Sequence, residues 1–185
     1  MKFSEIEAKY KAHDIKYKDF KDLVDKLNPR WQEVSSWDDY FVNKSDKDDF
    51  NRYRNFNNEG QITSKEKTSD INNNSRVEYN INLGKNNFET IKEWHKSKGY
   101  KHNFRIFKVC FIAWLSTVDL VYYIVYDEEL KELDRFIEIE CLEDHPWKDE
   151  EEAWNEILKY EKMLEPLGIV PQNRMKKSLF EIYKK

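Results

Sequence analysis

The sequence feature that most limits the fold is an alternation of charged and apolar residues that recurs along the chain. In FSEIEAKYKA at 3–12, charged residues occupy every second position and Ile, Ala and Tyr fill the gaps. Successive side chains of a β-strand point to opposite faces, so this segment predicts a strand with one ionic and one apolar face. The pattern recurs in FNRYRNF (50–56), ITSKEKT (62–68), RVEYNI (76–81) and FIEIEC (136–141). It therefore predicts a sheet with one ionic surface.

Other segments have helical periodicity and can cover the apolar surface of such a sheet. Apolar residues share one helical face in KDFKDLVDKL at 18–27 and in NFETIKEWHKSK at 87–98. A longer helix is expected within 151–169 and a last one at about 173–184. Turn-rich clusters separate the intervening strands, so we expect a four-strand meander between residues 36 and 83, followed by strands at about 103–115, 119–127 and 135–143.

These elements predict an α+β fold in a single domain spanning residues 1–185. We expect eight antiparallel strands that form a closed β-barrel, because closure removes exposed strand edges. The amphipathic helices are expected to pack on the outside of this barrel, against the apolar faces of the strands.

Composition limits the class of protein. Charged residues make up 37% of the chain, but aromatic residues make up 15%, which favours a folded protein over a disordered one. A net charge of -4 argues against a protein that coats duplex nucleic acid. No apolar run approaches the ~20 residues of a membrane span, and the N-terminus lacks the apolar centre of a signal peptide, so we expect a cytoplasmic protein. Cys110 and Cys141 are expected to be buried thiols.

If the helices cover the outside, the charged strand faces line an enclosed interior. Isolated charges in a dry interior cost several kcal/mol each, so such an interior has to be hydrated, internally paired or filled by a ligand. The signs are sorted by strand: carboxylates collect on the first and last strands, and cations on the third and fourth. Cations of this kind can surround a polyanion, and carboxylates can hold Mg²⁺ or Mn²⁺. The alternative is an open sheet whose charged face lies in solvent, with ion pairs worth roughly 0.2–1 kcal/mol each.

Short motifs resemble those of the CYTH superfamily, the triphosphate tunnel metalloenzymes, which include class IV adenylyl cyclases and thiamine triphosphatase. In chain order these are EIEAK (ExExK), DYF, RYR, TSK, RVE and FIEIE, and the closing MKKSLFEIYKK resembles the C-terminal stretch of that family. Three places depart from the family pattern, and one of them is Asn80, which stands where a further acid is often found after the R-x-E element. Cys110 stands where the family has a second cation after Lys108, with Arg105 expected on the opposite face, and Asp127 matches the family aspartate only when shifted by one residue.

The resemblance implies roles for particular residues. The triphosphate would be bound by Lys9, Arg52, Arg54, Lys65, Lys67, Arg76 and Lys108. The metal ion, Mg²⁺ or Mn²⁺, would be held by Glu5, Glu7, Glu78, Glu138 and Glu140. The water that attacks the phosphorus would be oriented or deprotonated by Glu5, Glu7 or Glu138.

The resulting expectation is a metal-dependent triphosphatase acting on inorganic triphosphate, a nucleoside triphosphate or a similar molecule. One alternative is an adenylyl cyclase that makes cyclic AMP and pyrophosphate from ATP, with Tyr40, Phe41 or Trp114 lining a base pocket. Another is a noncatalytic protein that binds a nucleotide or polyphosphate. The expected partner is a small phosphorylated molecule, neither a membrane nor duplex nucleic acid, and a homodimer stays open. We expect Glu5→Gln and Arg54→Ala to abolish turnover and to leave the fold largely intact.

Overall fold

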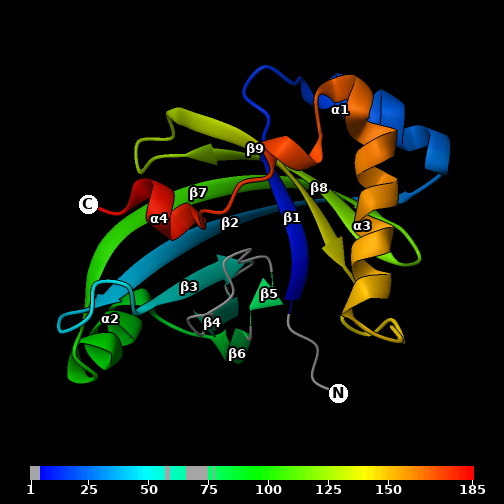
Figure 1. The fold of residues 1–185 in the computed structure, drawn as a ribbon. Helices are drawn as coiled ribbons and strands as arrows, with labels where there is room; N and C mark the ends of the chain where they lie inside the picture. The colour runs from blue at the N-terminus through cyan, green and yellow to red at the C-terminus, as the bar shows by residue number, and fades with distance from the viewer. Residues whose placement is uncertain (1–4, 57–58, 66–74, 77) are drawn as a thin grey trace.

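The computed structural model describes residues 5–56, 59–65, 75–76 and 78–185. The described chain forms one antiparallel sheet and four α-helices (Figure 1). The strands are β1 (Glu5–Lys11), β2 (Arg30–Asn43), β3 (Phe50–Phe56), β4 (Glu59–Lys65), β5 (Ser75–Arg76), β6 (Glu78–Lys85), β7 (Tyr100–Trp114), β8 (Val118–Tyr126) and β9 (Glu132–Cys141). The helices are α1 (Tyr17–Val24), α2 (Phe88–Ser97), α3 (Glu150–Leu164) and α4 (Leu179–Tyr183). None of the described helices is long and apolar enough to cross a membrane.

The sheet is strongly curved, and its strands follow the order β5-β1-β9-β8-β7-β2-β3-β4-β6 (Figure 1). The predicted antiparallel sheet and the predicted meander are therefore confirmed. The two strands at the ends of this order are successive in the chain. β5 pairs with β1 through Arg76 and Glu5, and β6, which begins at Glu78, pairs with β4 at Lys65. The structure names nine strands where eight were predicted, because the segment from 75 to 85 is divided into β5 and β6.

The convex face of the sheet carries the apolar side of the strands, and three helices cover it. Ile137 and Ile139 of β9 pack in one core with residues of α1 and α3, among them Phe20 and Ile157. The helix α3 begins where the Asp149 side chain accepts a hydrogen bond from the Glu152 backbone N–H, and glutamates fill its first turn, where they oppose the helix dipole. α2 covers a smaller core on β2, β3 and β4. The predicted placement of these helices is confirmed.

The C-terminal helix departs from the prediction in length and in place. The residues expected as one helix at about 173–184 form only the short α4, which lies on the concave side of the sheet (Figure 1). Leu179 and Phe180 pack there against Tyr40 and Phe50, and the Phe180 and Phe50 rings stack at 4.1 Å. The preceding segment cannot be helical because it runs beside β1, where the Met175 backbone N–H donates to the Lys9 carbonyl oxygen at 2.7 Å.

Candidate functional site

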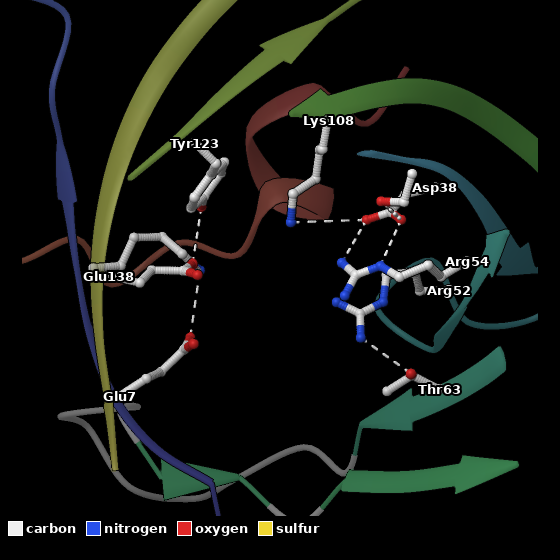
Figure 2. A network of polar contacts seen from close by, with 10 residues as sticks. Glu7, Asp38, Arg52, Arg54, Thr63, Lys108, Tyr123 and Glu138 are labelled. Carbon is white, nitrogen blue, oxygen red and sulfur yellow. Dashed lines mark hydrogen bonds and ion pairs between the residues drawn. The ribbon is translucent and has the colours of Figure 1, made fainter. Parts of the chain in front are cut away.

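A charged cavity of about 230 Å³ lies on the concave side of the sheet. Its lining includes Glu7 and Lys9 from β1, Arg52 and Arg54 from β3, Lys108 from β7, and Glu138 and Glu140 from β9, and α4 supplies Leu179 and Phe180 at one end. Figure 2 shows Glu7 and Glu138 on one side of this space and Arg52 and Arg54, with Asp38 beside Arg54, on the other. Arg54 and Glu138 therefore line the same cavity and do not lie on opposite faces of the sheet.

The basic side of the cavity is organised around Asp38 on β2, which is fully buried. The Arg54 guanidinium donates two hydrogen bonds to its carboxylate, each 2.8 Å long, and the Lys108 ammonium lies 4.0 Å from the same group. Burial alone would raise the pKa of Asp38, but the charges of Arg54 and Lys108 outweigh it and hold this pKa well below its usual range. Asp38 is therefore ionised at neutral pH and fixes the direction of Arg54.

Arg52 differs from its neighbour in having no carboxylate partner among the described residues. Its Nη2 donates to the Thr63 hydroxyl at 3.1 Å, and that hydroxyl donates to the Asn80 side-chain oxygen at 2.7 Å. The Nε atom of Arg52 is buried and has no hydrogen-bond partner among the described residues. An unsatisfied buried donor costs roughly 1–3 kcal/mol, so this guanidinium is available to an anion that enters the cavity (Figure 2).

The acidic side of the cavity is formed by β1 and β9, where Lys9 pairs in register with Glu138. The Lys9 ammonium lies 3.0 Å from Glu138 Oε1 and 3.3 Å from Glu7 Oε1. Tyr123 donates its hydroxyl to Glu138 Oε1 at 2.8 Å (Figure 2). Burial would raise the pKa of Glu138, but Lys9, Lys108 and the Tyr123 hydroxyl lower it to about 2. Glu138 is therefore a permanent carboxylate at neutral pH.

The residues predicted to hold a metal ion are only partly described. Glu7, Glu138 and Glu140 line the cavity, whereas the side chains of Glu5 and Glu78 lie outside the described part of the structure. Among the described residues, no three His, Cys, Asp or Glu side chains are gathered in a metal-binding arrangement. The Lys9 ammonium forms ion pairs with both Glu7 and Glu138, and its positive charge lies between these two carboxylates.

The other predicted residues fall into two groups. Lys9, Arg52, Arg54 and Lys108 come together at the cavity. The side chains of Lys65 and Arg76, and Lys67 as a whole, lie outside the described residues.

Of the aromatic residues considered for a base pocket, only Tyr40 lines the cavity. Phe41 points to the convex face, because neighbouring strand residues alternate, and packs under α2. Trp114 is 41% exposed and is not part of the cavity lining. Phe41 and Trp114 therefore do not lie at this cavity.

The departures from the family pattern are also placed, and Asn80 lines the charged cavity. Arg105 lies on the convex face, as expected, where it donates two hydrogen bonds to the buried Asp39. Asp127 lies in the turn between β8 and β9, and its carboxylate accepts hydrogen bonds from the backbone N–H groups of Glu129 and Lys131. Asp127 therefore stabilises a turn, and it is not among the cavity residues.

The sequence interpretation missed Asp38, Thr63, Asn80 and Tyr123 as parts of the site. Asp38 stands two residues before Tyr40, and this spacing places both on one face of β2. A strand reading of β2 could therefore have found Asp38. Tyr123 gave no comparable signal, because β8 beyond Asp119 is apolar or aromatic on both faces.

Comparison with known proteins shows the fold. No family model matches the chain, and no curated protein matches it. The solved structure of the PH1012 protein from Pyrococcus horikoshii is similar over 97% of this chain and 99% of that one, with a TM-score of 0.77 and 22% identity.

Two further solved structures with the same TM-score, 0.67, have very different names. The protein named "putative adenylate cyclase" from Vibrio parahaemolyticus is 12% identical over 98% of each chain. A chain of the Schizosaccharomyces pombe Mediator head module is 9% identical over 88% of this chain and 95% of that one. The fold is thus shared by proteins of unlike names, and function has to be argued from the cavity.

Proposed function

We propose that this protein is a divalent-metal-dependent triphosphatase whose substrate binds in the charged cavity. The observation that carries this proposal is the pairing pattern of the cavity residues. Lys9 and Arg54 already have carboxylate partners, whereas Arg52 presents a buried donor without one. Fixed cations facing fixed carboxylates match the needs of phosphoryl transfer, which depends mainly on positioning and charge neutralisation.

The proposal includes closure of the sheet into a barrel around the cavity. β5 pairs with β1 at one end of the strand order, and β6 pairs with β4 at the other. Since Arg76 and Glu78 are separated by a single position, one segment reaches both ends of the sheet. A substrate in the cavity would then be surrounded by strands, with α4 across one end.

On the basic side, Arg52, Arg54 and Lys108 would bind the phosphate oxygens. An arginine guanidinium is planar and offers paired donors that match phosphate geometry, and Asp38 fixes the orientation of Arg54 before substrate arrives. Lys65, Lys67 and Arg76 would add further cations, as the resemblance to the triphosphate tunnel enzymes implies.

On the acidic side, the described residues offer carboxylates, the kind of donor that a hard divalent cation prefers, but a metal site there would need side chains beyond the described ones. Glu7, Glu138 and Glu140 offer carboxylate oxygens, and Glu138 stays ionised because its pKa is about 2. Mg²⁺ or Mn²⁺ held by these residues, with Glu5 and Glu78 added by the resemblance, would supply charge neutralisation at the phosphate oxygens. The carboxylates of Glu5, Glu7 and Glu138 are the candidates to orient the attacking water or to accept its proton.

Cavity size favours a compact substrate. A volume of about 230 Å³ is smaller than the roughly 300–1,000 Å³ of sites that enclose drug-sized ligands. Inorganic triphosphate therefore suits this cavity better than a complete nucleotide does.

The second candidate is an adenylyl cyclase, and it is favoured by the name of the similar Vibrio parahaemolyticus protein. The aromatic rings of Tyr40 and Phe180 at the α4 end of the cavity would then contact the adenine. The third candidate is a protein that binds the same anions without turnover.

One experiment separates these candidates. The purified protein is incubated with tripolyphosphate or with ATP in the presence of Mg²⁺ or Mn²⁺, and products and bound ligand are identified. Orthophosphate release supports the triphosphatase, and cyclic AMP with pyrophosphate supports the cyclase. Bound but unchanged ligand supports the noncatalytic alternative, and lack of both binding and turnover refutes the proposal. Arg52→Gln serves as a control, because it should weaken binding in all three cases.

A further inference from the structure

A second pocket lies on the convex face of the sheet, between α2 and the adjacent ends of β2 and β7 (Figure 1). We call it the α2 pocket. Its volume is about 380 Å³, and Phe41 and Tyr100 supply apolar surface. It shares no lining residue with the charged cavity. Sites for small molecules usually measure roughly 300–1,000 Å³, so the α2 pocket is large enough for a small metabolite.

The lining of the α2 pocket carries an excess of positive charge, because four lysines face two glutamates, Glu89 and Glu93. The lysines are Lys44, Lys92, Lys96 and Lys101. Lys92 is paired with Glu89 at 3.1 Å. In the described part of the chain, no ion pair within 4 Å engages the other three.

These three lysines reach the pocket from different elements. Lys44 directly follows β2, Lys96 lies in the last turns of α2, and Lys101 lies near the start of β7. The Lys44 backbone N–H donates to the Gly99 carbonyl oxygen at 3.0 Å, which fastens the end of β2 to the turn between α2 and β7. The backbone that carries the lysines is therefore held together before any ligand arrives.

An oriented histidine completes the lining. His102 Nε2 lies 2.8 Å from Oδ1 of Asp39, a fully buried carboxylate that also accepts two hydrogen bonds from Arg105. Because an ionised carboxylate only accepts hydrogen bonds, Nε2 carries the proton in this pair. The other ring nitrogen, Nδ1, is then left for a ligand, as in many sites where a carboxylate orients an imidazole.

We propose that the α2 pocket binds a small phosphate monoester. Lys44, Lys96 and Lys101 would surround the phosphate as cations, and in its protonated form His102 would donate Nε2–H to Asp39 and Nδ1–H to one of the phosphate oxygens. A phosphate monoester carries close to two negative charges at neutral pH, and it therefore matches several convergent lysines better than a single carboxylate does. The remainder of the ligand would lie against Tyr100. This site goes beyond the proposed triphosphatase and does not depend on it.

The test uses AMP and inorganic phosphate as probes, added separately to the full chain carrying Arg52→Gln, which weakens anion binding in the charged cavity. Binding is measured by calorimetry, and the location by NMR shifts of the His102 and Tyr100 ring protons. The variants Lys96→Ala and Lys101→Ala should each weaken AMP binding about tenfold, as expected for loss of a charge-assisted contact. The control Lys162→Ala removes an exposed lysine of α3 and should change nothing.

AMP binding with shifts at His102 and tenfold losses in the two lysine variants would support the proposal. Equal binding by those variants and by the control would overturn it, and so would lack of binding at tens of millimolar probe. If inorganic phosphate binds as tightly as AMP, the site holds the phosphate group alone, and the part of the proposal that places an ester group against Tyr100 is refuted. None of these outcomes depends on whether the charged cavity hydrolyses triphosphate.

Discussion

Replacement of Arg54 by alanine is the sharpest test of the cavity, and the structure changes the expectation drawn from sequence. Arg54→Ala removes the two hydrogen bonds to Asp38, a carboxylate with no exposed surface. Breaking a buried ion pair from one side costs about 3–5 kcal/mol, because the remaining charge stays buried. The variant should therefore lose stability as well as phosphate binding.

Two features reduce this cost. The Arg54 side chain is 28% exposed, so water already screens the pair, and the Lys108 ammonium stays 4.0 Å from Asp38. We therefore expect Arg54→Ala to lower the free energy of unfolding by about 2–3 kcal/mol. Urea unfolding at pH 7, followed by circular dichroism, measures this change.

A double-mutant cycle isolates the pair. Asp38→Asn removes the buried carboxylate charge that Arg54→Ala leaves unpaired. The loss of unfolding free energy in the double variant Asp38→Asn with Arg54→Ala should therefore be smaller, by at least about 1 kcal/mol, than the sum of the losses in the two single variants. The matched control is Arg30→Ala, which removes an exposed arginine at the start of β2 and should change stability by less than about 0.5 kcal/mol. A loss for Arg54→Ala no larger than that of the control, or additive single variants, would refute the reasoning.

Three further predictions concern single titrating or hydrogen-bonding groups. Burial, with Asp144 nearby, raises the pKa of Asp119 to about 6. Ionisation of Asp119 therefore lowers the stability of the folded protein as pH rises from about 4 to 6. We expect Asp119→Asn to raise the melting temperature at pH 7 and to leave it unchanged at pH 4. Burial lowers the pKa of His95, whose Nε2 has no hydrogen-bond partner among the described residues. The stability of the protein should therefore fall as pH drops below about 6.5, where the unfolded chain binds a proton at this residue. Between pH 7 and 5, the urea midpoint of the variant His95→Phe should fall less than that of the unchanged protein. Tyr123→Phe removes a donor to Glu138 and should raise the pKa of that carboxyl, moving the acid limb of the activity profile to higher pH. The control Tyr122→Phe should leave the profile in place, because the Tyr122 hydroxyl interacts with the Ile15 carbonyl oxygen and with Arg135 and does not line the charged cavity.

The sequence predicted most of the sheet because alternation is a direct consequence of strand geometry. Glu7, Lys9, Arg52, Arg54 and Glu138 each occupy the alternate position of a strand, and all of them line one cavity. The structure turns the sorting of charge by strand into basic and acidic sides of the cavity, since β3 and β9 lie far apart in the strand order.

What sequence could not predict depended on contacts between distant segments. Asp38 and Asp39 are adjacent acids on opposite faces of β2, and the pairing of β2 with β7 shows that Arg105 is the partner of Asp39. The length of α4 was overestimated because the residues before it run alongside β1, where Arg174 forms an ion pair with the buried Glu161. Propensity gives no information about such a partner.

The pairing of β1 with β9 has a consequence for how the chain folds. These strands are far apart in the sequence, with Glu7 opposite Glu140, so their contacts carry a large loop-closure entropy. Hairpins such as β7–β8 can form early from neighbouring residues, but the acidic side of the cavity cannot form until β9 has been synthesised. We therefore expect slow folding with a late step in which β1 docks, and ribosome-bound chains that end before β9 should lack the cavity.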